Sequence, residues 1–284
     1  MPPWPLPPLP NWLRRYWLRR DWGWLHLAVG GGGPALFLVH GLGGSGHDFH
    51  AMARILARDF TVLIPDLPGF GYSDKPDLPY SPRLFARELA AAAGELGLSR
   101  AFWLGHSMGG QVVLTQAVER PDLVRALVGV CPSGGHARAD WLQKLLLALF
   151  TKPGGHLRLY HPALLVLFVR WCYGDPSHPS RAELTSRVRA QWDSLEGPLL
   201  ERSFIRSAKA LLAEPIWPRL DGLEAPVLLV GGRRDRIISQ RDLGRLLGHL
   251  PPDTPYELLP CGHLPVYTMP QELARITTRF LRSV

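Results

Sequence analysis

A tight turn in the middle of the chain constrains the fold more than any other feature. Residues 105–110 read Gly-His-Ser-Met-Gly-Gly, with the apolar run 101–104 before them and a helical pattern over 111–118 after them. This G-x-S-x-G sequence is typical of a sharp strand-to-helix turn that exposes its serine at the carboxyl edge of a sheet. The glycines indicate that no Cβ fits where strand, turn and helix crowd together. The pattern therefore predicts a turn that presents Ser107 beside the first N–H groups of a helix.

Length and composition favour one large α/β core. The chain has 284 residues, of which 46% are hydrophobic and 20% are charged, enough for such a core with an inserted segment. The net charge is +8, but the arginines are scattered and no basic tract alternates with stacking aromatics, so nucleic-acid binding is not expected. No apolar run reaches the ~18–20 residues of a membrane span, and no secretory signal is recognisable.

The cysteines also favour the cytoplasm. The chain has three of them, Cys131, Cys172 and Cys261. An odd number without metal-like spacing indicates neither a disulfide framework nor a zinc site. We therefore expect reduced thiols in a cytoplasmic protein.

The N-terminal segment, residues 1–21, is rich in Pro, Trp and Arg and is predicted to be a separate arm. Prolines dominate residues 1–10 and exclude a helix or a paired strand there. Placed on a helix, residues 11–20 would present Trp12 and Trp17 on one face and arginines opposite. One interpretation is a basic amphipathic foot at a membrane surface. The other is a helix that packs on its own domain, since so short a helix is marginal alone.

Strand-like and helix-like segments alternate through most of the remaining chain. Strands are expected at 24–29 (an edge strand), 35–39, 60–65, 101–104, 126–130, 226–231 and 256–259. Helices are expected at 51–58, 81–96, 111–118, 241–249 and 271–281. The helix at 81–96 carries the clearest boundary signals, with Ser81 as N-cap, Pro82 at its first position and Gly97 after its end. Such alternation predicts a parallel sheet covered by helices on both faces.

The alternation stops between residues 134 and 220. This segment holds helix-compatible stretches at 141–150, 163–173, 181–194 and 199–213, separated by Gly/Pro breaks. We interpret 134–220 as a helical cap inserted into a core formed by 22–133 and 221–284. The stretches are rich in Leu and Phe, which favours an apolar cleft beneath the cap.

Four motifs follow one another at the ends of predicted strands. They are His-Gly-Leu-Gly-Gly at 40–44, the loop 66–73, the turn 105–110, and Asp235 followed by His263. In this order the chain, from about residue 22 to its end, resembles the α/β-hydrolase fold family. The resemblance implies a mostly parallel sheet with helices on both faces and an inserted helical cap.

The same motifs contain the candidate catalytic residues. Ser107 is the expected nucleophile, His263 the general base, and Asp235 the carboxylate that orients the histidine. The chain order Ser, Asp, His is the one that this fold uses. The resemblance places the oxyanion hole at the backbone N–H groups of Leu42 and Met108.

Other polar residues near these motifs have expected structural roles. His40 is predicted to hold the oxyanion loop, Asp66 to brace its own loop, and the His106 side chain to point away from the nucleophile. No His/Cys/Asp cluster has metal spacing, and no G-x-G-x-x-G follows a strand. Neither a metal nor a cofactor is expected.

These residues predict a serine hydrolase that cleaves carboxylic esters with an apolar acyl or alcohol part, using water as second substrate. A carbon–carbon bond hydrolase of meta-cleavage type, a lactonase, a thioesterase and a perhydrolase would keep the same triad and stay open. So does a slow-turnover ligand receptor or signalling protein with a retained triad. Ser107 argues against dehalogenase and epoxide hydrolase chemistry, which uses an aspartate nucleophile in this family. The sequence gives no prediction of oligomeric state.

Overall fold

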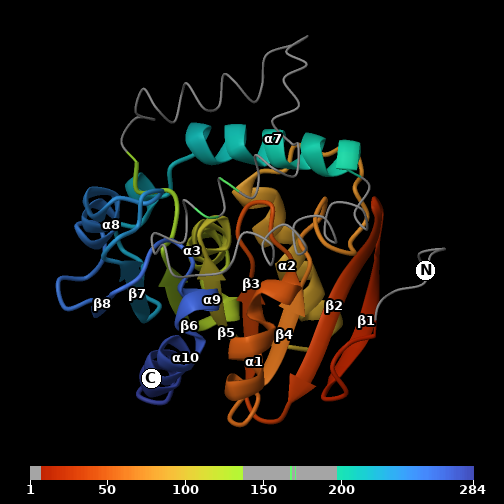
Figure 1. The fold of residues 1–284 in the computed structure, drawn as a ribbon, viewed down its shortest axis with the longest axis horizontal. Coiled ribbons are helices and arrows are strands. Elements are labelled where there is room, and N and C mark those ends of the chain that lie inside the picture. The colour runs from red at the N-terminus through yellow and green to blue at the C-terminus, as the bar shows by residue number, and fades with distance from the viewer. Residues whose placement is uncertain (1–7, 137–166, 168–169, 171–196) are drawn as a thin grey trace.

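The computed structural model describes residues 8–136, 167, 170 and 197–284 (Figure 1). The expected helices at 141–150, 163–173 and 181–194 lie outside these residues, apart from positions 167 and 170. The fourth expected helix of that segment, 199–213, is present as α7, Gly197–Ala213.

One twisted sheet forms the centre of the described structure. Its strands are β1 Leu13–Arg20, β2 Gly23–Gly31, β3 Ala35–Val39, β4 Thr61–Pro65, β5 Ala101–His106, β6 Val124–Val130, β7 Val227–Gly232 and β8 Tyr256–Leu259. Their spatial order is β1-β2-β4-β3-β5-β6-β7-β8. The pairs β1/β2 and β2/β4 are antiparallel, whereas every pair from β4/β3 to β7/β8 is parallel. This confirms the predicted mostly parallel sheet.

The prediction of a helix at 11–20 is wrong. Residues 13–20 form the edge strand β1, which pairs with β2 in a continuous register from Leu13 opposite Gly30 to Arg20 opposite Gly23. Leu13 and Leu18 are buried on it. Eight paired residues satisfy backbone groups that a short isolated helix leaves to solvent. Residues 13–20 are therefore part of the sheet rather than a separate arm, and the strand expected at the edge, 24–29, is the second strand.

Helices cover both faces of the sheet. They are α1 His50–Leu56, α2 Pro82–Glu95, α3 Met108–Glu119, α7, α8 Gln240–Leu247, α9 Pro265–Thr268 and α10 Pro270–Leu281, with 3₁₀ helices η1 Gly46–Phe49, η2 Pro121–Leu123 and η3 Trp217–Arg219. The N-cap predicted for α2 is confirmed, because the Ser81 side chain accepts a hydrogen bond from the N–H of Leu84 at 3.2 Å.

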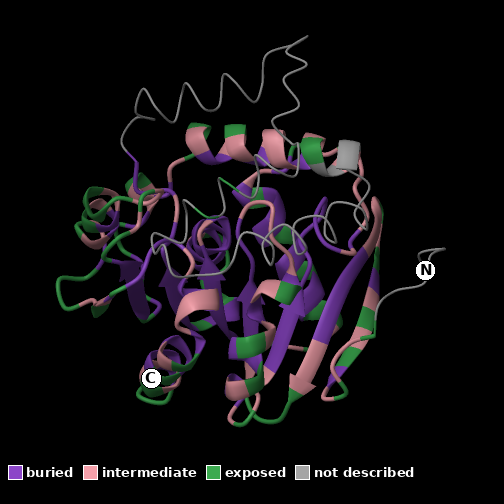
Figure 2. Cartoon of the chain, viewed as in Figure 1, coloured by how far each residue is buried: buried purple, intermediate pink, exposed green. Residues whose placement is uncertain are grey.

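Two apolar layers sandwich the sheet. One gathers buried residues of α2, α3 and α8, and the other gathers those of α1 and α10. Alternate residues of β5 supply both layers, since Trp103 belongs to the first and Phe102 to the second. The strands β5 and β7 are buried throughout (Figure 2), as expected for parallel strands covered on both sides.

The carboxyl ends of the parallel strands meet at one edge of the sheet. The loops that follow β3, β5, β7 and β8 there carry residues 40–44, Ser107, Asp235 and His263. Helix α7 runs across this edge in Figure 1, where the Phe204 ring would lie 3.1 Å from a Cβ built on Gly43. The fold thus brings residues that are far apart in sequence to one rim beneath α7.

Candidate active site

The serine turn is strained and closely packed. Ser107 has φ 55° and ψ −114°, a left-handed conformation that costs a non-glycine residue on the order of 1–3 kcal/mol. A Cβ at Gly105 would lie 2.1 Å from the Gly109 carbonyl oxygen, and one at Gly109 would lie 2.1 Å from the Val39 carbonyl oxygen. Both glycines are therefore required, and α3 starts directly after the serine.

Ser107, His263 and Asp235 form one hydrogen-bonded chain. Ser107 Oγ lies 3.0 Å from His263 Nε2, and His263 Nδ1 lies 2.8 Å from Asp235 Oδ2. The side chains of His263 and Asp235 are 7% and 2% exposed, respectively, so water has little access to the bond between them.

The structure keeps Asp235 ionised and fixed. Its Oδ1 accepts hydrogen bonds from the N–H groups of Ile237 at 2.8 Å and Ile238 at 2.9 Å. Burial acts to raise the pKa of Asp235, but the hydrogen bond and charge of His263, with these two N–H groups, hold it below its ordinary value of 3.8. An ionised Asp235 can only accept, so it places the imidazole proton on Nδ1 and leaves Nε2 free to accept from Ser107.

The loop after β3 lies against the serine. A Cβ at Gly41 would be 3.2 Å from Ser107 Cβ, a tight contact that the glycine avoids. Leu42 follows in this loop, and Met108 is the first residue of α3. Within the described ranges, the N–H groups of Leu42 and Met108 have no hydrogen-bond acceptor. Two free donors beside the Ser107 hydroxyl at a helix N-terminus are suited to an anionic oxygen.

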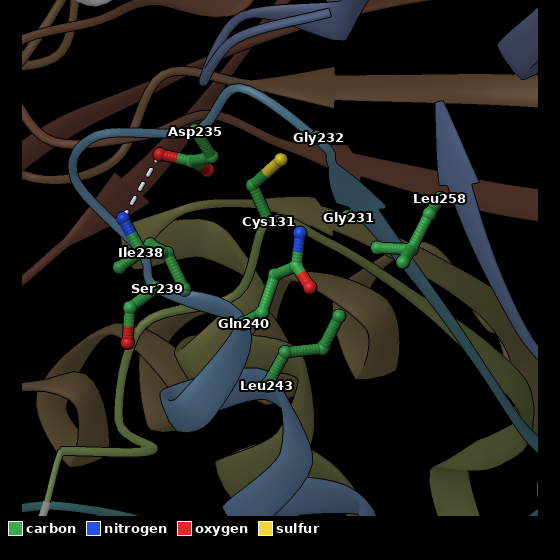
Figure 3. Close-up of a pocket in the computed structure, with 9 residues that line it drawn as sticks. All are labelled: Cys131, Gly231, Gly232, Asp235, Ile238, Ser239, Gln240, Leu243 and Leu258. Carbon is green, nitrogen blue, oxygen red and sulfur yellow. Dashed lines mark hydrogen bonds between the residues drawn. The ribbon is translucent and has the colours of Figure 1, made fainter. Parts of the chain in front are cut away.

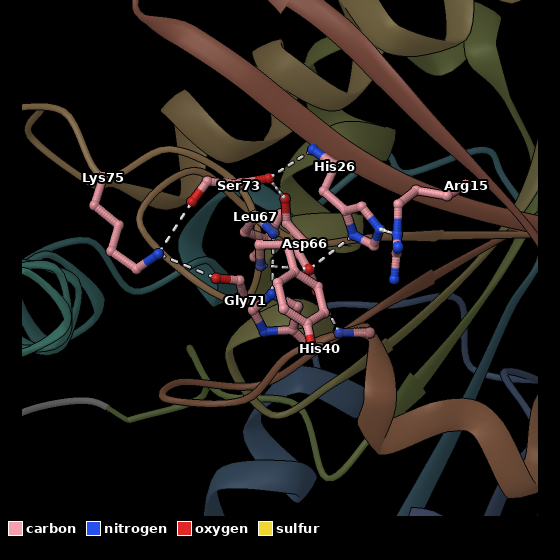
Figure 4. Close-up of polar contacts among 10 residues, drawn as sticks. Arg15, His26, His40, Asp66, Leu67, Gly71, Ser73 and Lys75 are labelled. Carbon is pink, nitrogen blue, oxygen red and sulfur yellow. Dashed lines mark hydrogen bonds and ion pairs between the residues drawn. The ribbon is translucent and has the colours of Figure 1, made fainter. Parts of the chain in front are cut away.

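His40 and Asp66 hold this loop, as Figure 4 shows. His40 Nδ1–H donates to the Gly41 carbonyl at 2.8 Å, while its Nε2 accepts from the N–H of Leu67 at 3.0 Å. Asp66 accepts from the N–H of Tyr72 in its own loop at 2.7 Å, as expected. It also accepts from the N–H of Gly46 at 2.6 Å.

A further contact of Asp66 reaches the edge strands. His26, on β2, places Nδ1 2.8 Å from Asp66 Oδ2, and Arg15, on β1, donates from Nε to His26 Nε2 at 3.1 Å. Burial acts to raise the pKa of Asp66, but interactions with His26 and the N–H of Gly46 hold it well below its ordinary value. Sequence reasoning missed this chain, because nothing in the residue pattern pairs β1 and β2 with residue 66.

His106 contacts the backbone of His263. Its Nε2–H donates to the backbone carbonyl of His263 at 2.7 Å, and the two rings lie 5.1 Å apart. Burial, followed by the charge of His263, lowers the pKa of His106 to about 3, so it stays neutral. The sequence did not predict this contact with the His263 carbonyl.

Cys131 lies beside Asp235 and His263. Ligand atoms of Cys131, Asp235 and His263 lie within 4.8 Å of one another, and a small pocket, partly open to solvent, adjoins Cys131 and Asp235 (Figure 3). Burial and the charge of Asp235 raise the pKa of Cys131 well above 9.0. A protonated thiol is a poor metal ligand, and the acid and the imidazole already bind each other, so this trio does not fit a resident metal.

The sequence itself belongs to a known family. A model of the alpha/beta hydrolase fold matches residues 34–270. The chain belongs to the α/β-hydrolase fold family. Among the residues the structure describes, none of the helices combines the length and apolar character that crossing a membrane requires.

Relatives of this α/β hydrolase include named enzymes. A pimeloyl-[acyl-carrier protein] methyl ester esterase of Xanthomonas oryzae pv. oryzae is 28% identical over 270 residues, covering 92% of this chain and 100% of the relative. An uncharacterised protein of Mycobacterium tuberculosis is 26% identical, covering 89% of this chain and 76% of the relative. The family and the esterase relatives support hydrolase activity.

Solved structures agree on the fold. A bacterial membrane phospholipase A superposes with a TM-score of 0.80 at 25% identity, covering 96% of this chain and 86% of that one. The enol-lactonase of Burkholderia xenovorans LB400 reaches a TM-score of 0.81 at 17% identity, covering 94% and 100%. At that identity the lactonase likeness concerns the fold alone.

Proposed function

We propose that this α/β hydrolase cleaves carboxylic esters through an acyl-enzyme on Ser107. The observation that carries the proposal is the chain Ser107 Oγ to His263 Nε2 at 3.0 Å and His263 Nδ1 to Asp235 at 2.8 Å. The methyl ester esterase relative supports an ester as the substrate class. Ser107 in place of an aspartate argues against epoxide opening.

Acylation uses each member of this chain. As Ser107 Oγ attacks the ester carbonyl, its proton moves to His263 Nε2, and the imidazolium that forms is stabilised by Asp235. The carbonyl oxygen gains negative charge and accepts from the N–H groups of Leu42 and Met108. His263 then gives its proton to the departing alcohol oxygen, the C–O bond breaks, and the acyl group stays on Ser107.

Deacylation repeats these steps with water. His263 takes a proton from a water molecule as it attacks the acyl carbonyl, and the same two N–H groups stabilise the second tetrahedral anion. Collapse returns the proton to Ser107 Oγ and releases the carboxylic acid. The strained backbone of Ser107 keeps Oγ at the open rim in both half-reactions.

We assign the substrate's apolar part to the space beneath α7. Phe204 faces Gly43 of the loop that holds the oxyanion donors, and the partly buried Leu42 adds an apolar side chain nearby. In this proposal residues 134–220 form an insertion whose last helix covers the site. Such a lining prefers an acyl chain or aromatic group to a sugar or a highly charged substrate.

The test is the variant Ser107→Ala with p-nitrophenyl esters. Loss of the nucleophile is expected to lower kcat by about 10⁶-fold. The protein is expected to stay folded, because the change removes a single oxygen atom and keeps the Cβ in place. The matched control is Ser99→Ala, an exposed serine, which keeps wild-type turnover. Near-full activity of Ser107→Ala would reject the nucleophile.

A panel of acyl lengths and leaving groups then separates the reactions that share this triad. Esters with medium apolar acyl chains are expected to give the highest kcat/KM. Faster cleavage of thioesters, lactones or a vinylogous diketone acid would replace the ester assignment. Stoichiometric acylation without turnover would favour a receptor with a retained triad.

A further inference from the structure

A hydrogen bond joins the two loops that flank Ser107. The hydroxyl of Tyr267, on α9, donates to Oδ1 of Asp48, on η1. Asp48 follows the oxyanion loop, and Tyr267 follows His263 by four residues. These loops come from opposite ends of the sequence, and α9 lies close to α1 in Figure 1.

Asp48 is hydrogen-bonded to the end of the oxyanion loop. Its second carboxylate oxygen, Oδ2, accepts from the N–H of Ser45 at 3.3 Å, and the N–H of Asp48 donates to the Ser45 carbonyl at 3.0 Å. A Cβ at Gly44 would lie 2.2 Å from that same Oδ2. Asp48 therefore fixes the segment directly after Leu42, whose N–H is one of the two proposed oxyanion donors.

Tyr267 belongs to the loop that carries His263. Its N–H donates to the Leu264 carbonyl at 3.0 Å, which makes it part of the turn that leaves His263. His106 restrains the same turn through the His263 carbonyl. The hydroxyl of Tyr267 thus connects the turn after the base with the loop before α1.

We propose that Asp48 and Tyr267 are a positioning pair that sets the oxyanion donor of Leu42 in register with His263. Neither side chain takes part in the triad bonds. The pair acts by keeping two separately folded loops at a fixed separation, so that proton transfer and oxyanion stabilisation occur in one geometry. The catalytic consequence rests on the proposed ester hydrolysis; the physical link between the loops does not.

The experiment uses Tyr267→Phe in the full chain, which removes one hydroxyl and keeps the ring. The matched control is Tyr256→Phe, since Tyr256 is 56% exposed on β8. Hydrogen exchange followed by mass spectrometry reports the link without any substrate. Tyr267→Phe is expected to speed exchange in the peptide covering 41–48 as well as in 264–268, and Tyr256→Phe in neither. Unchanged exchange over 41–48 overturns the proposal, whatever the ester assay shows.

The kinetic arm separates positioning from a merely structural role. Tyr267→Phe is expected to lower kcat about 10-fold while KM changes less than about twofold. Affinity for an aryl boronic acid, which accepts Ser107 Oγ to form a tetrahedral anion, should fall by the same factor as kcat. If Tyr267→Phe changes hydrogen exchange but keeps the kcat of the wild type, the positioning role is overturned. If the wild-type protein hydrolyses no ester and Tyr267→Phe still changes exchange, the ester assignment is rejected and the link between the loops stands.

A second variant guards against unfolding. Asp48→Asn keeps an amide oxygen for the N–H of Ser45 and turns its NH₂ toward the Tyr267 hydroxyl, so the bond that this hydroxyl donates to the carboxylate is lost. If the two residues act through one bond, the double variant loses no more kcat than the more affected single variant. Additive losses would show that they act independently and would overturn the pair.

Discussion

The variant Asp235→Asn tests the proposed role of the acid with little change in shape. The Asp235 Oδ1 accepts from two backbone N–H groups, at 2.8 and 2.9 Å, so an asparagine keeps its carbonyl oxygen there and turns its NH₂ toward His263. The reverse orientation would place NH₂ against those N–H groups. A donor facing Nδ1 forces the imidazole proton onto Nε2, where it points at Ser107 Oγ and cannot accept.

The expected result is a fall in kcat of about 10⁴-fold, the cost of the wrong tautomer. Steady-state hydrolysis of a p-nitrophenyl ester measures it, and thermal unfolding monitors the fold. Asp122→Asn is the control, because Asp122 pairs with Arg120 at the exposed surface and should leave kcat unchanged. A loss smaller than about 10-fold, with Asp235→Asn folded, would refute the tautomer argument.

Two further predictions concern the packing around the site. Asp66→Asn is expected to lower the free energy of unfolding by about 3 kcal/mol or more at pH 7. Because the pKa of Asp66 is lower in the folded than in the unfolded protein, its stabilising contribution is full above the unfolded pKa of about 4 and is lost as pH falls through the folded pKa, so the difference from wild type should shrink below about pH 4. Denaturant unfolding at a series of pH values measures this difference, and a difference that does not change with pH would contradict the prediction. Gly105→Ala should abolish soluble folded protein or ester turnover, since its Cβ meets the Gly109 carbonyl, whereas Gly94→Ala, with open space around it in α2, should add roughly 0.5–1 kcal/mol in the same unfolding assay.

Much of the sheet could be predicted because its strands are continuous apolar runs with glycine or proline at their ends. The strand 256–259 matches its predicted bounds. The helix that begins at Pro82 was predicted from its Ser81 N-cap and the glycine after its end. The prediction of a helix at 11–20 failed because Trp12, Trp17 and the arginines fit one face of a helix as well as they fit a strand. Only the pairing with β2 decides between them, and pairing between strands is a tertiary property that local periodicity does not encode.

The candidate site shows the same division. Ser107 and His263 stand in motifs whose glycines reveal the turns, and the structure brings them together with Asp235. The contacts that support them leave no such mark. His106 holds the His263 carbonyl, 157 residues away in sequence. Tyr267 binds Asp48, 219 residues away. Such contacts depend on how the loops at the sheet edge pack together, so only the three-dimensional structure reveals them.

The most direct measurement of the central claim is the mass of the protein during turnover. Wild-type enzyme mixed with an excess of a p-nitrophenyl ester and quenched in acid within the first turnovers is expected to gain the mass of one acyl group. Peptide mapping should place that group on Ser107. Full turnover of the ester with no acyl group on Ser107 at any quench time, together with retained activity in Ser107→Ala, would contradict the acyl-enzyme mechanism.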